Sequence, residues 1–301
     1  MIGMMDHFTH EGVMKYLRRL FLLALTVAAL GVSAEEKAPK VRVTVVSFNI
    51  RYPMDKAPND WGRRKKRVVN DLKRMKPGIF GLQEATPKQI KDLRVLGYRH
   101  IGHGRERDLK GEGNPVFYDP RRFELVEDRT VWLSRTPQVY SLAHGSGMPR
   151  IVTFGVFRDK RSKRKFVFAS THLHHENQKV CHPEQIQAVI DELEPYVRRG
   201  MTVILVGDFN SSPAGVAYRE TAKVLHDSYL VSERTPIRPE KCTYHGFVPM
   251  KRRRNHKENY RIDYIWVTPD VKVLRYVSVN NFDERGLASS DHYPQLAEVE
   301  F

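Results

Sequence analysis

The hydrophobic pattern of the chain predicts strands and helices that follow one another along the sequence. Residues 41–50 alternate apolar and polar side chains and are rich in β-branched residues, which is typical of a strand. Residues 61–76 carry apolar side chains at helical spacing and end at a Pro-Gly pair. The same criteria predict further strands at 79–83, 115–118, 123–133, 151–157, 166–172, 202–206, 262–268, 271–279 and 296–301, and further helices at 87–96, 183–197 and 214–224. No repeat and no Pro/Ser-rich linker interrupts residues 35–301, so we expect one mixed α/β domain.

The N-terminal stretch has the order of a secretory signal: basic residues, an apolar run at 20–32 and small residues at 32–34. The run is too short to span a bilayer comfortably. We therefore expect residues 1–34 to be cleaved, and residues 35–301 to reach the periplasm or the medium without a stable membrane span. An uncleaved N-terminal anchor is the alternative, and Met14 is an alternative start.

The chain has 301 residues and a formal net charge of +16, which points to polyanions such as nucleic acid, anionic lipid or phosphorylated small molecules. The charge becomes +15 after removal of residues 1–34, which hold three basic and two acidic residues. Only two cysteines are present, Cys181 and Cys242, which excludes a disulfide-dense scaffold. In an exported protein this pair either forms one disulfide or stays reduced, and the sequence leaves both open.

Polar residues gather where predicted strands end. The segments concerned are Ser47-Phe48-Asn49, Leu82-Gln83-Glu84, Thr171-His172-Leu173, Gly207-Asp208-Phe209-Asn210 and Ser290-Asp291-His292. Taken singly, each has a structural explanation, such as a turn or a helix N-terminal charge. Together they supply three carboxylates, two amides and two imidazoles. Oxygen ligands suit Mg²⁺ or Mn²⁺ better than Zn²⁺, and imidazoles suit proton transfer.

In that order and strand context, the segments resemble the endonuclease/exonuclease/phosphatase superfamily, the deoxyribonuclease I-like metal-dependent phosphoesterases. The matching stretches are VVSFNIRY at 45–52, GLQEA at 81–85, FASTHLHHEN at 168–177, VILVGDFNSSP at 203–213, RIDYIWV at 261–267 and SSDHYPQLAEV at 289–299. GEGNPVFYDPRRFEL at 111–125 and VWLSRTP at 131–137 look like a bacterial exported branch. The resemblance implies a four-layer α/β/β/α sandwich of two mostly antiparallel sheets flanked by helices.

The resemblance also implies a metal site. Glu84 would be the principal Mg²⁺ ligand, with Asn49 beside it. Asp291 would bind the metal directly or through water. Asp208 and Asn210 would orient the nucleophile and the phosphate, or hold a second metal.

The proton-transfer and substrate roles follow from the same resemblance. His292 would take a proton from the attacking water, with Asp263 fixing its ring. His172 would donate a hydrogen bond or a proton to a phosphoryl or leaving oxygen. Arg150 would contact phosphate, although a surface arginine is the alternative, and Asn114 would line the cleft.

The chain departs from the family pattern at His174. The branch commonly has Asp where this chain has His174, so the local hydrogen-bond partner differs.

Of three basic runs, 63–67 and 158–165 are expected on solvated faces, away from the cleft. The third, at 251–257, either grips a polyanion beside Asp263 or forms a solvated hairpin tip.

The leading interpretation is an exported Mg²⁺-dependent phosphoesterase, a nuclease-type phosphodiesterase acting on nucleic acid, with no oligomer expected. The alternative is a phosphoesterase for a lipid headgroup or a small molecule, because the same site serves all these branches. A third interpretation, a non-catalytic binding protein, is disfavoured because every expected ligand residue is present.

Overall fold

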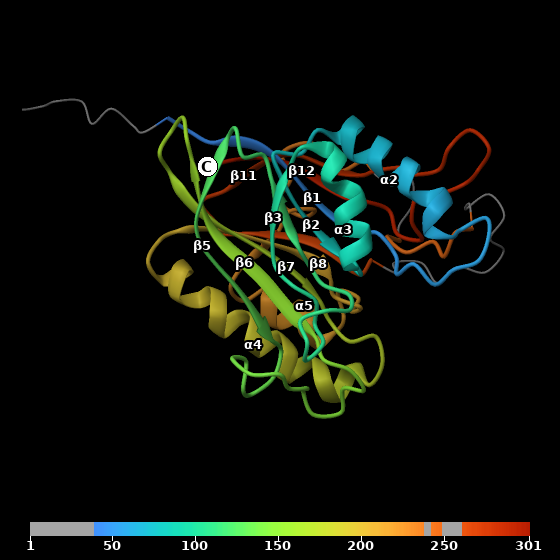
Figure 1. The fold of residues 1–301 in the computed structure, drawn as a ribbon. Coiled ribbons are helices and arrows are strands. Elements are labelled where there is room, and N and C mark those ends of the chain that lie inside the picture. Colours follow the sequence, from blue (N-terminus) through green and yellow to red (C-terminus); the bar gives the residue numbers. More distant parts are fainter. Residues whose placement is uncertain (1–38, 238–241, 249–260) are drawn as a thin grey trace, which may run out of the picture. The chain divides into compact units, whose positions relative to one another are not determined.

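Two six-stranded sheets pack face to face in the computed structural model, which describes residues 39–237, 242–248 and 261–301 (Figure 1). Residues 40–301 form one compact unit. The predicted signal at 1–34 and the basic run at 251–257 lie outside the described residues, so both stay predictions.

The first sheet has the strand order β11-β12-β1-β2-β4-β3. Its strands are β1 (Arg42–Asn49), β2 (Ile79–Gln83), β3 (Arg99–Ile101), β4 (Val116–Tyr118), β11 (Lys272–Ser278) and β12 (Gln295–Glu300). β1 and β2 run parallel, and the other neighbours are antiparallel. The C-terminal ends of β1 and β2 therefore lie together at one edge of the sheet.

The second sheet has the order β5-β6-β7-β8-β10-β9. Its strands are β5 (Phe123–Trp132), β6 (Ile151–Asp159), β7 (Lys165–His172), β8 (Thr202–Asp208), β9 (His226–Asp227) and β10 (Asp263–Val267). Here β7 and β8 form the parallel pair. Each sheet thus carries one parallel pair at its centre within an otherwise antiparallel arrangement.

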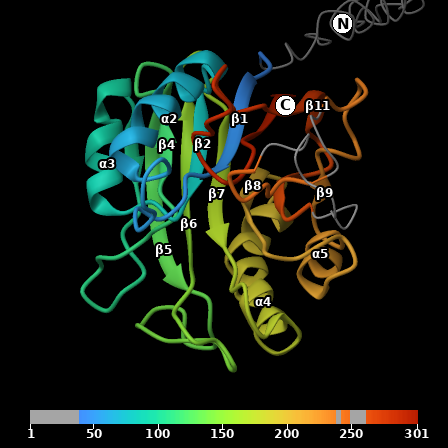
Figure 2. The same ribbon diagram turned by 90° about the vertical axis from the view of Figure 1, so that its right-hand side faces the viewer.

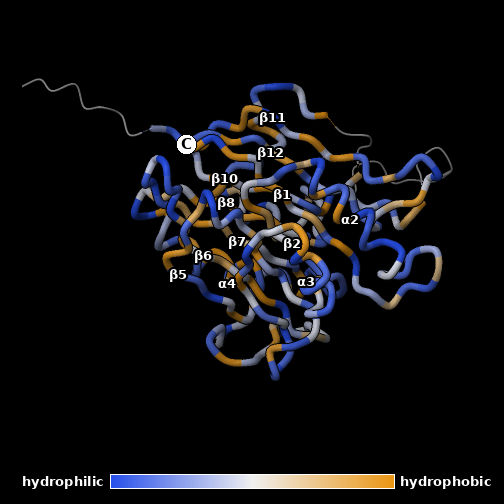
Figure 3. The backbone as a smooth tube through the Cα atoms, turned by 45° about the horizontal axis from the view of Figure 1, so that its top comes forward, coloured by the Kyte–Doolittle hydropathy of each residue, from blue (hydrophilic) through white to orange (hydrophobic). Residues whose placement is uncertain are grey.

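Helices cover the outer face of each sheet (Figure 2). α2 (Trp61–Met75), α3 (Pro87–Leu93) and the 3₁₀ turn η1 (Arg94–Leu96) pack on the first sheet, and α4 (Gln178–Arg198) and α5 (Val216–Thr221) pack on the second. A third apolar cluster lies between the sheets, built from inward side chains such as Val45, Phe166 and Val206. Hydrophobic colour accordingly gathers along the strands in Figure 3. The four-layer sandwich implied by the sequence is confirmed.

The elements differ from the prediction at three places. β3 and β9 have only three and two residues, too short to show a periodicity. α4 begins at Gln178 instead of Pro183, so this proline lies inside the helix and leaves one helical hydrogen bond unmade. Cys181 and His182, immediately before the proline, are both buried.

The sequence predicted that the basic run at 63–67 is a solvated face, and the structure contradicts this for two of its arginines. Arg64 is fully buried and donates hydrogen bonds to four backbone carbonyl oxygens. Arg67 also turns inward and donates to the carbonyl oxygen of Ala288 at 2.9 Å. The helical pattern could not predict the burial of these arginines, because an arginine counts as a polar residue whether its guanidinium faces water or backbone carbonyl oxygens.

The two cysteines do not form a disulfide. The Cys181 Sγ donates instead to the carbonyl oxygen of Glu176 at 3.4 Å. Among the described residues, no helix combines the length and the apolar character needed to cross a bilayer.

Candidate active site

The strand pairing places the predicted site residues at one edge of the two sheets. Asn49 ends β1 opposite Gln83, so Glu84 follows directly at the same edge. In the second sheet His172 pairs with Asp208, and Asp263 pairs with Asp208 from the other side. The Nδ2 atom of Asn49 donates to Asp208 Oδ2 at 3.0 Å and so joins the two sheets at this edge.

Glu84 is held by two hydrogen bonds that favour its ionised form. Its Oε1 accepts from Asn49 Nδ2 at 2.9 Å, and its Oε2 accepts from the backbone N–H of Tyr52 at 2.6 Å. Although burial acts in the opposite direction, these donors lower the pKa of Glu84. Glu84 also has a φ of 59°, a left-handed conformation that is strained for this residue type. Its carboxylate is therefore fixed in place and charged.

Asp291 is the second carboxylate of the predicted metal site. It is buried, and burial together with the nearby charge of Glu84 raises its pKa. Arg51 Nη1 lies 3.5 Å from Asp291 Oδ2 and partly offsets that charge. A half-buried carboxylate and a buried one that repel one another and line one cavity fit a divalent cation such as Mg²⁺.

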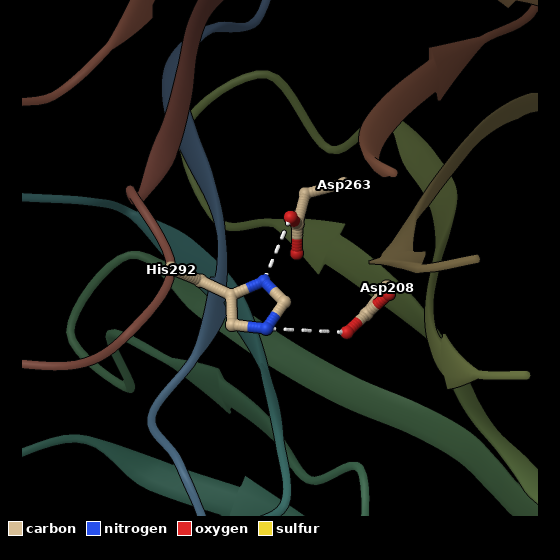
Figure 4. Close-up of side chains that lie close together, drawn as sticks. All are labelled: Asp208, Asp263 and His292. Atoms are coloured by element: carbon tan, nitrogen blue, oxygen red, sulfur yellow. Dashed lines mark hydrogen bonds and ion pairs between the residues drawn. The ribbon is translucent and has the colours of Figure 1, made fainter. Parts of the chain in front are cut away.

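His292 and Asp263 form a catalytic-type pair (Figure 4). The Nδ1 of His292 lies 2.9 Å from Asp263 Oδ2, and its Nε2 lies 3.7 Å from Asp208 Oδ2. Burial alone would lower the pKa of His292, but the charges of Asp263 and Asp208 overcome it and raise the pKa to about 10. Asp263 thereby fixes the ring so that Nε2 faces the cavity side of the pair.

Asp208, Asp263 and His292 also offer ligand atoms within 4.8 Å of one another, a spacing that could hold a metal ion. The hydrogen bond between His292 and Asp263 already uses two of these atoms. The cluster therefore has the geometry of a hydrogen-bonded His-Asp pair beside a second carboxylate.

The Nε2 atom of His172 faces the Asn210 amide and lies 3.5 Å from Asp208 Oδ2. One N–H of the Asn210 amide donates to the Leu173 carbonyl oxygen at 3.0 Å, so the other points at His172 Nε2, 2.9 Å away, and this ring nitrogen accepts. Burial and the charge of Arg150 hold the pKa of His172 well below its usual value. The ring is thus neutral and bonded to Asn210, and its predicted role toward a phosphoryl or leaving oxygen stays a prediction.

A cavity of about 610 Å³ opens beside these groups. Its lining includes most of the site residues: Glu84, Arg150, His172, Asp208, Asn210, Asp291 and His292. Asn49 and Asp263 do not line the cavity, but each forms a hydrogen bond with a residue that does. Asn114 does not line it, contrary to the sequence prediction, because its Nδ2 donates to the Ile151 carbonyl oxygen at 2.8 Å and ties its segment to the start of β6.

Arg150 is the buried cation of this cavity. Its side chain contacts the Nδ1 of His175 at 3.3 Å, while its Nε has no hydrogen-bond partner. Within the described ranges, no carboxylate forms an ion pair with it, and burial lowers its pKa to about 10. The charges of Glu112, Glu84 and Asp208 act on the guanidinium from a distance, and burial without a directly bonded carboxylate is less costly when an anion binds there.

Several cavity residues were not singled out from the sequence. They are Arg51, Tyr52, Arg105, Glu106, Gly111, Glu112, Met148, His175, Tyr244 and Ile262. Arg51, Glu112 and His175 all lie inside the stretches that carried the family resemblance. Position within those stretches was therefore the available signal, but it does not tell which side chains face the cavity.

His174, the departure from the family pattern, has a structural role. It is only 1% exposed, and its Nε2 accepts from the backbone N–H of Gly147 at 3.3 Å. Its backbone N–H donates to Gln185 Oε1 at 2.9 Å. Burial lowers the pKa of His174 to about 4, so the ring is neutral in the folded protein.

A family model described as "Endonuclease/Exonuclease/phosphatase family" matches residues 46–292. A mannosyl-6-phosphatase from Bacteroides thetaiotaomicron is 30% identical, with a TM-score of 0.77 over 86% of this chain and 100% of that chain. An endonuclease/exonuclease/phosphatase family protein of the same species is also 30% identical, with a TM-score of 0.78 over 87% and 99% of the two chains.

Among curated proteins, Protein angel from Drosophila melanogaster is 26% identical over 163 residues, which are 51% of this chain and 44% of that protein. The chain spans about half the length of the curated relatives it matches.

Proposed function

Because the chain belongs to the endonuclease/exonuclease/phosphatase family, whose members are hydrolases of phosphate esters, we propose that it is a Mg²⁺-dependent phosphatase that acts on phosphate monoesters of small alcohols. The observation that carries this proposal is Arg150, a buried guanidinium without a carboxylate partner in the described part of the chain. A monoester dianion would accept a charge-assisted hydrogen bond from the Arg150 Nε, which has no partner among the described residues.

The cavity supports a small substrate. Its volume of about 610 Å³ lies within the range of pockets that enclose small ligands. Arg51 and Arg105 add two further guanidinium groups to its lining. One of the structural relatives at about 30% identity, matched over 86% of this chain, is a mannosyl-6-phosphatase.

Each residue has a role in this proposal. Glu84 and Asp291 would hold Mg²⁺, with Mn²⁺ as a substitute, and the ion would neutralise charge on the phosphoryl oxygens. His292 would accept the proton of the attacking water at Nε2 while Asp263 holds Nδ1. For this the ring must start neutral, and a cation near the same carboxylates lowers its pKa in that direction. Asp208 and Asn210 would orient the water and the phosphate.

A panel of substrates tests the proposal. Purified residues 35–301 would be incubated with p-nitrophenyl phosphate, a monoester, and bis-p-nitrophenyl phosphate, a diester, with Mg²⁺ and then with excess EDTA. We expect the monoester to be hydrolysed at least about tenfold faster, and EDTA to abolish the reaction until Mg²⁺ or Mn²⁺ is restored. Faster hydrolysis of the diester would contradict the monoester assignment, and undiminished turnover in EDTA would contradict the metal.

A variant of Arg150 tests its proposed contact with phosphate. Arg150→Met should raise KM for the monoester by about tenfold or more, because a buried charge-assisted hydrogen bond to phosphate is lost. Arg135→Met is the matched control, because the Arg135 side chain is 86% exposed and lies outside the cavity lining.

A nuclease-type phosphodiesterase is the second candidate, favoured by the net charge of +16, which steers polyanions toward the protein. Plasmid, single-stranded DNA and RNA belong in the same panel. Metal-dependent cleavage of any of them at a rate above that of the monoester would favour this candidate.

We also propose that the protein is exported to the periplasm or the medium after cleavage near Ala34. The support is the basic, apolar and small-residue order of the N-terminal sequence. Expression of the full chain followed by N-terminal sequencing of the exported fraction tests it. A protein found only inside the cell with its first 34 residues intact would overturn it.

A further inference from the structure

A glycine-rich hairpin between β3 and β4, residues 103–113, forms one wall of the cavity. The Arg105 N–H donates to the Glu112 carbonyl oxygen at 3.0 Å, and the Gly104 N–H donates to the Leu109 carbonyl oxygen at 2.9 Å. Gly113 exchanges two backbone hydrogen bonds with Ala85, at 2.9 and 3.2 Å. The hairpin is thus paired directly to the residue after the proposed metal ligand Glu84. In Figure 2 it lies at the end of the sheets where β5 and β7 finish.

The backbone of this hairpin tolerates little change. A Cβ on Gly104 would collide with the carbonyl group of Lys110, and one on Gly113 would collide with that of His103. Trp132, at the end of β5, donates from its Nε1 to the Arg105 carbonyl oxygen at 2.8 Å. The hairpin therefore presents its side chains from a fixed backbone.

Two of those side chains, Arg105 and Glu112, form an ion pair inside the cavity lining. They are only 14% and 13% exposed, and burial raises the pKa of Glu112. The charge of Arg105 acts on His172, and the charges of Arg150 and Glu84 act on Glu112. Because Arg105 and Glu112 line the same cavity as Glu84, Arg150 and His172, they can meet the part of the substrate attached to the phosphate.

We infer that the hairpin 103–113 is the subsite for the leaving alcohol, and that Arg105 and Glu112 select an alcohol with several hydroxyl groups, such as a hexose. This inference rests on the proposed phosphatase function. A hydroxyl both donates and accepts, so neighbouring hydroxyls can bond to the guanidinium and the carboxylate together. An alkyl chain in the same place would strip water from both charges and replace none of the lost hydrogen bonds.

The test compares leaving groups of similar reactivity. Release of inorganic phosphate would be measured for glucose 6-phosphate, mannose 6-phosphate and n-hexyl phosphate, since all three are esters of primary alcohols. We expect kcat/KM for the better hexose phosphate to exceed that for hexyl phosphate by about 100-fold, because polar subsites discriminate strongly against partners that lack hydroxyls. The wild-type ratio needs no variant and so does not depend on how a variant folds.

Glu112→Gln then locates the selectivity. We expect it to reduce the hexose-to-hexyl ratio by about tenfold, since a carboxylate hydrogen bond is replaced by a weaker neutral one. Glu124→Gln is the control that should leave the ratio unchanged, because Glu124 is exposed and pairs with Arg158 far from the cavity lining. Thermal unfolding of both variants records their folding.

The outcomes separate the two proposals. If none of the monoesters is hydrolysed, the proposed phosphatase function fails. If they are hydrolysed but hexose and hexyl phosphates have equal kcat/KM, or Glu112→Gln lowers both equally, the leaving-group subsite is overturned while the phosphatase function stands.

Discussion

The Nη1 atom of Arg64 lies 2.9 Å from the carbonyl oxygen of Ser289, 225 positions away in the sequence. The same nitrogen donates to the Ile50 carbonyl oxygen at 2.7 Å, and Nη2 donates to that of Arg51 at 3.1 Å. One buried side chain from α2 thus ties the loop after Asn49 to the segment that carries Asp291. The guanidinium also lies 5.6 Å from the ring centre of Trp61 and 5.5 Å from that of Phe247.

Arg64→Lys should destabilise the fold and loosen the metal site together. An ammonium cannot reproduce the planar fork of donors, so buried carbonyl oxygens lose their partners, at a cost of about 3 kcal/mol in the free energy of unfolding. Urea denaturation and Mg²⁺ titration calorimetry measure the two effects. Arg63→Lys is the control, because the Arg63 side chain is 62% exposed. Equal stability of the two variants would show that the buried bonds to carbonyls contribute little.

Glu84→Gln should weaken Mg²⁺ binding by about tenfold or more, because a neutral amide replaces a charged oxygen ligand and its NH₂ group faces the Asn49 amide. The change preserves the shape of the side chain but leaves one N–H facing another donor, so we expect only a modest fall in the melting temperature. Calorimetry of Mg²⁺ binding checks the first expectation. Glu176→Gln serves as a neutral comparison, because the Glu176 side chain is 71% exposed. Unchanged Mg²⁺ affinity in Glu84→Gln would remove this residue from the metal site.

His292→Ala should behave in the opposite way. It removes the proposed base, so turnover should fall by about 10²-fold to 10⁴-fold, while Glu84 and Asp291 still bind Mg²⁺. Steady-state kinetics and calorimetry on the same preparation separate the two properties. Near-normal turnover in this variant would mean that another group takes the proton.

His174 should make the fold sensitive to acid. Its pKa is about 4 in the folded protein against an ordinary 6.5, so the unfolded chain binds more protons between these values. The stability that comes from the neutral ring is fully present above about pH 6.5 and is lost as the pH falls toward 4. The loss from this residue reaches about 3 kcal/mol at most.

Urea denaturation at pH 7.5, 6 and 5 measures this loss. His174→Gln, which keeps an acceptor for the Gly147 N–H but does not titrate, should show a shallower fall in the free energy of unfolding. Because His172 and His182 also have lowered pKa values, only the difference between variant and wild type reports on His174. Parallel pH profiles for the two proteins would assign the acid sensitivity to other groups.

The sequence by itself determined the elements whose pattern is local, together with the chemistry at the strand ends. Period-two alternation marked β1, and period-3.6 spacing marked α2, because those side chains repeat within a single element. Glu84, Asp208 and His292 were recognisable because each follows or borders an apolar strand in a characteristic order. The family resemblance, and not the periodicity, supplied the four-layer arrangement.

Only the tertiary structure decided what depends on contacts between distant segments. It placed Arg64 against carbonyl oxygens instead of water, turned the Nε2 of His172 toward the Asn210 amide and left Asn114 outside the cavity lining. It also brought Arg105 and Glu112 to the cavity from a hairpin without a periodic signal. The physical reason is that a polar residue contributes the same polar position to the sequence pattern whether its side chain contacts water, a carbonyl oxygen or a substrate. Which of these it meets is fixed only when non-local strands pair and set the edge at which their ends meet.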